Sequence, residues 1–307
     1  MRVTRYAGRL LLLVLIGSIA GCGPLSVQQE KQMGRQAQRQ MRAENTLLRD
    51  LVTVNYIREL GAKLVAAARP TPFDIRFYVV EDDDLNAGAY PGGTIIIHTG
   101  IIQAAKDVSE LASVLAHEIS HVTDRHFAKR YNKSRNTGVV AQAAVIAAGI
   151  LTGSQQVANA ASLGTQIAGK AYLAGYSRED ESAADTLAIE TLVKAGYDPE
   201  GMVRFFDFLQ QEQGGGGGPG FLMTHPSAAD RAERTRALVA AAIAAEPERR
   251  FKRDDGGKLE IIQRRLELII GTDFDVRDDI DDEGDVEGEV EVYEEQNWNL
   301  KRRGRRD

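Results

Sequence analysis

A single cysteine, Cys22, occurs in the whole sequence of 307 residues, so no disulfide bond can form within the chain. In an oxidising compartment a lone free thiol would be a liability. Long apolar runs are also missing, because no stretch after the first 21 residues approaches the roughly 20 apolar residues that a membrane-spanning helix needs. The sequence therefore predicts neither a disulfide scaffold nor a membrane-spanning helix in the mature chain.

Basic residues are in the minority. Lys and Arg number 38 against 44 Asp and Glu, which gives a formal net charge of −6. The charge would fall to −9 if the N-terminal segment with Arg2, Arg5 and Arg9 were removed. The basic cluster at residues 301–306 lies at the extreme C-terminus. Binding to nucleic acid needs clustered Lys and Arg, so we expect no nucleic-acid partner.

The N-terminal segment has the order of a secretory signal peptide. Three arginines precede a short apolar run at residues 10–16, and small residues lead from there to Cys22. The run Ile19-Ala20-Gly21-Cys22 resembles a bacterial lipobox, in which the cysteine is acylated and becomes the new N-terminus. Several acyl chains would give a stable anchor, since each buried methylene contributes about 0.8 kcal/mol. We therefore expect a signal peptide over residues 1–21 and a lipidated Cys22, with an ordinary secretory signal as the alternative.

The residue after the cysteine bears on the location of such an anchor. Gly23, rather than an aspartate, stands at this position. By resemblance to enterobacterial lipoproteins, this predicts an anchor in the outer membrane, on its periplasmic face. The expected localisation is therefore the bacterial cell envelope.

Apolar residues recur with the period of helices along most of the chain, and two short strands lie between them. The hydrophobic content of 43% is enough for one large core. We expect a scaffold helix over residues 27–68, strands at residues 75–80 and 94–99, a helix from a capping box at Asp107 and Glu110 to about residue 130, and a helix over residues 178–195. No repeat with the 34-residue period of helical hairpins is present.

Three segments depart from this pattern. Residues 139–151 are almost wholly apolar, and we expect a helical hairpin that packs near the site or dips toward the membrane surface. Residues 214–218 are consecutive glycines and predict a flexible loop. The charged stretch over residues 251–307 predicts a partly disordered appendage. The predicted organisation is a signal peptide, one domain over residues 22–250 and this appendage.

The motif His117-Glu118-Ile119-Ser120-His121 lies within the helix predicted around it. Residues four apart are turned by about 40° on a helix, so both imidazoles can reach one Zn²⁺ ion. Glu118 is adjacent and can act as the general base toward a water molecule. The chain contains only five histidines, so this spacing points to a metal site rather than to two unrelated histidines. We expect one zinc ion per chain.

A catalytic zinc site needs a third protein ligand and an open fourth position. His126 lies five residues after His121 and nine after His117, which turns it about 140° and about 180° away on a continuous helix. We therefore expect a structural or supporting role for His126. Glu181 and Asp185 share a helix face at four-residue spacing, so one can ligate while the other accepts a hydrogen bond from a ligating histidine. An acidic first turn of an ordinary helix is the alternative.

Four motifs follow one another along the chain. They are Asn86-Ala87-Gly88-Ala89-Tyr90-Pro91-Gly92-Gly93 ahead of the second strand, the His117 motif with Val122 and Arg125-His126, Ser177-Arg178 with Glu181 and Asp185, and Thr224-His225-Pro226 with Arg231. Together they resemble the zinc metallopeptidase family of the CAAX prenyl endopeptidase and HtpX type, and within it the periplasmic lipoprotein members. The resemblance spans about residues 40–245. The family often has a second glutamate where Ala183 stands in this chain.

The resemblance implies a fold and a set of roles. The fold is α+β: a mainly helical zincin domain of the gluzincin type, with a small β-sheet beside the metal site. Glu181 is implied as the third zinc ligand and Asp185 as the partner of a ligating histidine. His225 matches a family histidine near the active site, which either stabilises the oxyanion or caps the zinc in a latent form. A loop histidine without either role is the alternative.

The same resemblance gives the second predicted strand a role in substrate binding. An edge strand beside the metal would bind the substrate backbone by β-augmentation. The residues expected to do so are Thr94, Ile95, Ile96, Ile97 and His98. A plain core strand is the alternative, because the three isoleucines form a continuous apolar run.

The sequence therefore predicts a membrane-anchored zinc endopeptidase with polypeptide substrates. That these are misfolded or unassembled cell-envelope proteins is implied by the resemblance alone. A chaperone or assembly factor for outer-membrane proteins, with its proteolysis held latent, is the rival, and a structural lipoprotein without metal is third. Nothing in the sequence indicates the oligomeric state.

Overall fold

The computed structural model describes residues 23–135, 175–212, 221, 225 and 228–270. Cys22, the apolar segment at residues 139–151, the glycine run at residues 214–218 and the tail beyond residue 270 lie outside these described residues. Contacts divide the chain into two units, residues 1–266 and 267–307, and every described strand belongs to the first.

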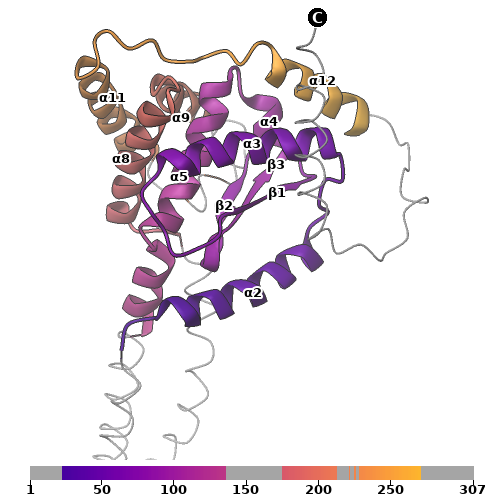
Figure 1. The fold of residues 1–307 in the computed structure, drawn as a ribbon, viewed down its shortest axis with the longest axis vertical. Helices are drawn as coiled ribbons and strands as arrows, with labels where there is room; N and C mark the ends of the chain where they lie inside the picture. Colours follow the sequence, from indigo (N-terminus) through magenta and orange to yellow (C-terminus); the bar gives the residue numbers. More distant parts are fainter. Residues whose placement is uncertain (1–22, 136–174, 213–220, 222–224, 226–227, 271–307) are drawn as a thin grey trace, which may run out of the picture. The chain divides into compact units, whose positions relative to one another are not determined.

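The described part of the first unit is mainly helical, with one small sheet (Figure 1). The labelled helices are α2 (Val27–Glu44), α3 (Leu51–Ala67), α4 (Thr99–Ala104), α5 (Val108–Thr123), α8 (Arg178–Ala195), α9 (Glu200–Glu212), α11 (Ala228–Ala244) and α12 (Lys258–Ile270), which crosses the boundary between the units. Residues 126–135 are helical as well, after a two-residue turn at residues 124–125. The strands are β1 (Arg76–Val80), β2 (Ala87–Ala89) and β3 (Thr94–His98), and the 3-10 helix η1 (Pro91–Gly93) joins β2 to β3. The predicted α+β class is confirmed.

The three-stranded sheet has the order β1-β3-β2. β1 pairs with β3 in parallel, and β2 pairs with β3 in antiparallel register, with Gly88 opposite Ile96. All five residues of β3 are buried. The prediction that residues 94–98 form an edge strand is therefore wrong, because β3 has a neighbour on each side and β2 is the edge. The continuous apolar run of β3 is the pattern of a central strand.

α5 is the central helix of the domain. Its residues from Val108 to Val122 are all buried. It contacts α3, α8, α9 and the strands β2 and β3. Figure 1 shows α8, α9 and α11 grouped on one side of it. Because the helix is enclosed, any polar side chain on it needs a partner or a ligand.

The helix predicted over residues 27–68 is two helices. The chain leaves α2 at Asn45, Leu47 forms a bridge with Val80 of β1, and Asp50 caps α3 by accepting the N–H of Thr53. The prediction of one continuous helix is wrong, because the cap at Asp50 starts a new helix and the bridge ties the turn to the sheet. α2 therefore runs in its own direction and packs against η1. The approach is so close that a Cβ on Gly34 would lie 2.3 Å from the Pro91 carbonyl oxygen, so this position needs glycine.

α12 lies within the segment that was predicted as an appendage. Its Leu259, Ile262 and Leu266 are buried, and Nε2 of Gln263 donates to the carbonyl oxygen of Ala105 at 2.7 Å. The first unit therefore continues past residue 250, the predicted end of the domain, to residue 266.

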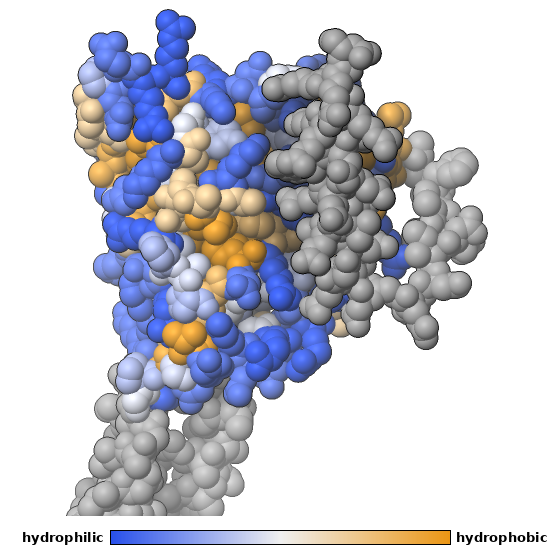
Figure 2. Space-filling view, viewed as in Figure 1, coloured by the Kyte–Doolittle hydropathy of each residue, from blue (hydrophilic) through white to orange (hydrophobic). Residues whose placement is uncertain are grey.

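The face of the protein in Figure 2 is mostly hydrophilic, with apolar areas between charged side chains. Leu51, Val52, Ile261 and Leu268 are the large apolar side chains that are exposed among the described residues. Within the same ranges, no helix combines the length and the apolar character needed to cross a membrane.

Candidate metal centre

The start of α5 is fixed by a cap at Asp107. Its carboxylate accepts the backbone N–H groups of Ser109 and Glu110 at 2.9 and 3.1 Å. Nη2 of Arg204 in α9 donates to the same carboxylate at 3.0 Å. The carboxylate of Glu110 accepts the N–H of Lys106, so it extends the cap by one residue. These contacts anchor the helix that carries the His117 motif.

α8 begins with a capping box that was not predicted from the sequence. Ser177 and Asp180 each accept the other's backbone N–H through their side chains. Glu181 follows in the first turn and Asp185 lies one turn further along, and both side chains are fully buried against α5. Gly196, with φ of +82°, ends the helix in the left-handed conformation that glycine favours. The predicted helix over residues 178–195 is confirmed.

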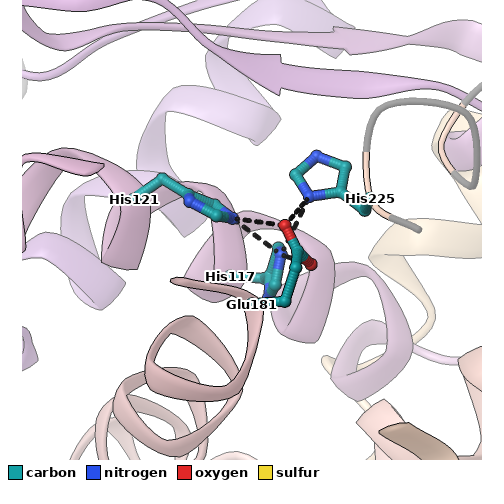
Figure 3. A group of neighbouring side chains, drawn as sticks. All are labelled: His117, His121, Glu181 and His225. Carbon is teal, nitrogen blue, oxygen red and sulfur yellow. Dashed lines mark hydrogen bonds and ion pairs between the residues drawn. The ribbon is translucent and has the colours of Figure 1, made fainter. Parts of the chain in front are cut away.

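Four buried side chains point toward one another between α5 and α8 (Figure 3). They are His117, His121, Glu181 and His225, and one donor atom from each lies within 4.8 Å of the others. Nε2 of His117 is 3.0 Å from Nε2 of His121 and 3.3 Å from Nδ1 of His225. Glu181 Oε1 lies 2.8 Å from Nδ1 of His225 and 3.5 Å from Nε2 of His121.

This donor set fits one zinc ion. Metal–ligand bonds of about 2.0–2.1 Å place neighbouring ligands of a tetrahedral ion roughly 3.3 Å apart, which is close to the separations of these atoms. Three imidazole nitrogens and one carboxylate oxygen are ligand types that zinc takes. Two ring nitrogens at 3.0 Å inside a protein also need a proton or a cation between them, since their lone pairs otherwise repel.

Asp185 and Arg231 support the cluster from behind. Oδ1 of Asp185 lies 3.1 Å from Nδ1 of His117, and Nη1 of Arg231 lies 2.6 Å from Oε2 of Glu181. Burial would lower the pKa of His117, but its contacts with Asp185 and Glu181 outweigh burial and raise the pKa to about 9. Burial would likewise raise the pKa of Glu181, yet the imidazoles of His225 and His117 hold it below its usual range. Glu181 is therefore an anion ready to ligate a cation.

Glu118 has a different environment. Both carboxylate oxygens are buried and neither makes a hydrogen bond. Nε2 of His225 lies 3.3 Å from Oε1, without the alignment of a hydrogen bond. Burial raises the pKa of this carboxyl. A buried carboxylate with free acceptor positions and increased basicity has the properties of a general base.

His225 is held in the cluster by contacts on several sides. The ring of Phe221 stacks on it with the centroids 4.5 Å apart, and the Phe221 N–H donates to the Leu85 carbonyl at 2.9 Å. Nη1 of Arg231 donates to the carbonyl oxygen of His225 at 3.4 Å. As it lies here, His225 completes a set of four donors, which is the number that a closed tetrahedral zinc site takes.

Tyr176 and His126 flank His121. The contact of His126 agrees with the supporting role expected for it, whereas the stacking of Tyr176 was not predicted. The ring of Tyr176 stacks on His121 with the centroids 3.8 Å apart. The guanidinium of Arg130 lies over the Tyr176 ring, 4.3 Å from its centroid. His126 lies 2.8 Å from His121 through their Nδ1 atoms. The expectation that a continuous helix turns His126 away from His121 is wrong, because α5 ends at Thr123.

The structure brings most of the predicted site residues together. His117, His121, Glu181 and His225 form the cluster, and Glu118 and Asp185 touch it. From the sequence alone, Arg231 could be recognised only as part of a motif. Its role depends on contacts between α11 and α8. The position of an arginine six residues after a histidine does not reveal such contacts.

Comparison with known proteins gives a family match over the same region. The profile described as Peptidase family M48 matches residues 52–239, which include all four cluster residues. The beta-barrel assembly-enhancing protease of Yersinia pestis is 37% identical over 217 residues, covering 70% of this chain and 44% of that protein. The protein of the same name from Escherichia coli strain K12 is 32% identical over 233 residues, covering 73% of this chain and 48% of that protein.

A shorter relative matches as well. The metalloprotease LoiP of Escherichia coli strain K12 is 28% identical over 170 residues, covering 55% of this chain and 64% of that protein. The chain spans about half the length of the two beta-barrel assembly-enhancing proteases. The match to them therefore concerns the part that carries the metal cluster.

Proposed function

The chain belongs to peptidase family M48 and is a metallopeptidase, and from this premise we propose that it is a zinc-dependent endopeptidase acting on unfolded or unassembled proteins of the bacterial cell envelope. The observation that carries the proposal is the buried cluster of His117, His121 and Glu181 beside the hydrogen-bond-free carboxylate of Glu118. These three residues would hold the ion. A bound zinc ion supplies Lewis acidity, which polarises a substrate carbonyl and lowers the pKa of water to about 7.

Glu118 performs the proton transfers in this proposal. Its free carboxylate oxygens can take a proton from the attacking water and deliver it to the leaving amine. Burial raises the pKa of Glu118 and so brings it closer to neutral pH. The carboxylate of Asp185 lies beside Nδ1 of His117 and favours a proton on that atom, so that Nε2 is the nitrogen that would ligate the ion after losing its own proton.

His225 would keep the enzyme latent. Its Nδ1 would occupy the fourth ligand position of the ion. Its Nε2 lies beside Glu118, in the space that the attacking water would need. A catalytic zinc site needs an open fourth position, so His225 must leave before hydrolysis. Of the two roles that the sequence leaves open, the cap therefore agrees better with these contacts than oxyanion stabilisation does.

Substrate would bind along the outer edge of β2, which no other strand of the described residues occupies. Asn86 and Tyr90 bond to His98 and Thr94 of β3, so in the alternating antiparallel ladder the N–H and C=O groups of Ala87 and Ala89 point away from the sheet. An extended peptide can pair with these groups regardless of its side chains. The hydroxyl of Tyr176 donates to the Ala89 carbonyl at 3.4 Å, so an incoming strand would replace this contact.

Backbone recognition of this kind selects extended chain. Unfolded or unassembled proteins expose such segments, whereas folded ones pair them internally. The relatives whose names refer to β-barrel assembly agree with substrates in the cell envelope. Acylated Cys22 would place the enzyme there, at the periplasmic face of the outer membrane.

A second function, a latent protease that acts as chaperone or assembly factor, is favoured by one observation. With His225 in the cluster, the edge of β2, which pairs with no further strand among the described residues, could still bind an extended peptide while hydrolysis is blocked. Peptide binding by the closed form without cleavage would support this alternative.

The test measures zinc content and casein cleavage of the purified mature chain. We expect about one zinc ion per chain, and Glu118→Gln should keep the zinc and the fold yet lose hydrolysis by several orders of magnitude. Glu179→Gln, an exposed glutamate in the first turn of α8, is the matched control and should change neither. Cleavage by Glu118→Gln within tenfold of the parent would contradict the assignment of Glu118 as the general base. A zinc content near zero would favour a structural lipoprotein.

A further inference from the structure

His126 is buried and uses both ring nitrogens in short contacts. Its Nδ1 lies 2.8 Å from Nδ1 of His121, and its Nε2 lies 2.8 Å from Oδ2 of Asp124. His126 is not among the four donors of the cluster. It meets His121 at the ring nitrogen that does not face the other donors, because Nε2 of His121 is the atom that faces His117.

The partners determine where the protons are. Oδ2 of Asp124 also accepts a hydrogen bond from Nζ of Lys129 at 2.6 Å, so this carboxylate acts as an acceptor. Nε2 of His126 therefore carries a proton, and Nδ1 of the neutral ring is an acceptor. The proton between the two Nδ1 atoms then belongs to His121. As a result, Nε2 of His121 keeps its lone pair and directs it at the cluster.

We propose that His126 is a positioning residue of the metal site: it accepts the Nδ1–H of His121 and thereby fixes the tautomer and the ring orientation that ligation requires. The inference rests on the proposed zinc-dependent function. His117 has a carboxylate directly beside the corresponding nitrogen, since Oδ1 of Asp185 lies 3.1 Å from its Nδ1, although without the alignment of a hydrogen bond. For His121 the carboxylate of Asp124 acts through the imidazole of His126. Outer partners of this kind contribute about 10–100-fold to metal affinity.

A strained turn brings His126 back to His121. α5 ends at Thr123, and Arg125 has φ of +51°, which lies in the left-handed region that residues with side chains seldom adopt. The guanidinium of Arg125 donates to Oε2 of the buried Glu30 at 2.8 and 2.9 Å, and to the carbonyl oxygen of Leu25 at 2.8 Å. These bonds to α2 and its leading residues stabilise the turn, and the turn sets the place of His126.

The test compares three substitutions at this position in the full chain. His126→Ala removes the acceptor, His126→Asn can place an amide oxygen near the position of Nδ1, and His126→Gln places its polar atoms further out. We expect zinc affinity, measured by competition with a chromophoric chelator, to fall about 10–100-fold for Ala and Gln. Asn should stay close to the parent. Thr191→Val is the control, since it removes a buried hydrogen bond of α8 far along the helix from Glu181.

The second readout is the tautomer of His121 in the metal-free protein. Side-chain ¹⁵N NMR spectra distinguish a proton on Nδ1 from one on Nε2, and we expect Nδ1–H in the parent and in His126→Asn, with a mixture in His126→Ala. Zinc binding by His126→Ala equal to that of the parent, an equal loss in the Asn and Ala variants, or an Nε2–H tautomer in the parent would each overturn the proposal. A parent that binds no zinc would contradict the proposed function instead, and the tautomer would still decide this inference.

Discussion

Arg231 and Asp185 form a buried ion pair joined by two hydrogen bonds, Nε to Oδ2 at 3.0 Å and Nη2 to Oδ1 at 2.7 Å. The third nitrogen of the same guanidinium lies 2.6 Å from Oε2 of Glu181. One arginine of α11 thus holds the carboxylate expected to bind the metal and the carboxylate that orients His117. The planar guanidinium allows this, because its donors point in fixed directions that a lysine cannot reproduce.

Arg231→Met should destabilise the metal-free protein strongly. Two buried carboxylates would lose their cation, and breaking a buried pair costs roughly 3–5 kcal/mol. Arg236→Met, on the same helix, is the matched control, because its pair with Asp207 is exposed and such pairs contribute about 0–1 kcal/mol. Urea unfolding of both variants gives the comparison. Equal losses in the two would mean that the buried fork has no special role.

His225→Ala should increase hydrolysis. Removing the fourth donor opens the position that a catalytic site needs and frees the space beside Glu118. We expect a faster cleavage of casein per bound zinc, together with weaker zinc binding because one ligand is gone. The double variant with Glu118→Gln should be inactive, which shows that the gain uses the same base. A fall in activity of about 100-fold or more would instead assign His225 to oxyanion stabilisation.

Zinc uptake near neutral pH should release a proton from His117. The pKa of this ring is raised to about 9 in the metal-free protein, so at pH 7 it carries a proton that the ion must displace. Apparent zinc affinity should therefore rise by about tenfold per pH unit from pH 7 to 9 and level off above. Calorimetry in two buffers of different ionisation enthalpy measures the proton count. Heats that do not depend on the buffer would contradict the raised pKa.

The parts of the site that follow local spacing could be predicted from the sequence. His117 and His121 lie on one face of α5, and Glu181 and Asp185 on one face of α8, because a four-residue spacing on a helix determines this without further information. The caps at Asp107 and Gly196 are local signals as well. That two such helices pack face to face could not be derived from spacing alone, and it entered through the resemblance to a family.

The parts that depend on distant contacts could not be predicted. The helix expected to run unbroken to about residue 130 is interrupted after Thr123 and resumes at His126, because Arg125 is held in a left-handed turn by Glu30 of α2, 95 residues earlier. β2 consists of Ala87, Gly88 and Ala89, which lack the β-branched and aromatic side chains typical of strands. The edge of the sheet was therefore placed at the strand that has the stronger pattern, which lies in the centre.

Ala89→Pro tests the outer edge of β2. Proline removes the outward N–H and puts its ring where an incoming strand would lie, yet it leaves the bonds of β2 to β3 intact because Ala89 does not take part in them. We expect normal zinc content and thermal stability with a large loss of casein cleavage. Ala89→Ser keeps the N–H and should behave as the parent. Full activity of the proline variant would mean that substrate does not pair with β2.

The last prediction concerns the membrane anchor. Cys22 is the only cysteine, and no helix among the described residues is long and apolar enough to cross a membrane. If Cys22 is acylated, Cys22→Ser should leave the membrane fraction once its signal peptide has been removed, because the anchor is then gone. Fractionation after an alkaline carbonate wash measures this, and Gly23→Ser is a control that keeps the cysteine.

The soluble Cys22→Ser protein should still cleave casein at the rate of the parent. From Leu25 onward the chain is tied to the domain by its own contacts: the Leu25 N–H donates to Oδ1 of Asn132 at 2.8 Å, and the side chain packs against Phe127. These contacts need no anchor, so the metal site should keep its geometry in solution. If the variant with a removed signal peptide stays in the washed membrane pellet, another part of the chain, such as the apolar stretch at residues 139–151, must bind the membrane, and anchoring through Cys22 alone would be wrong.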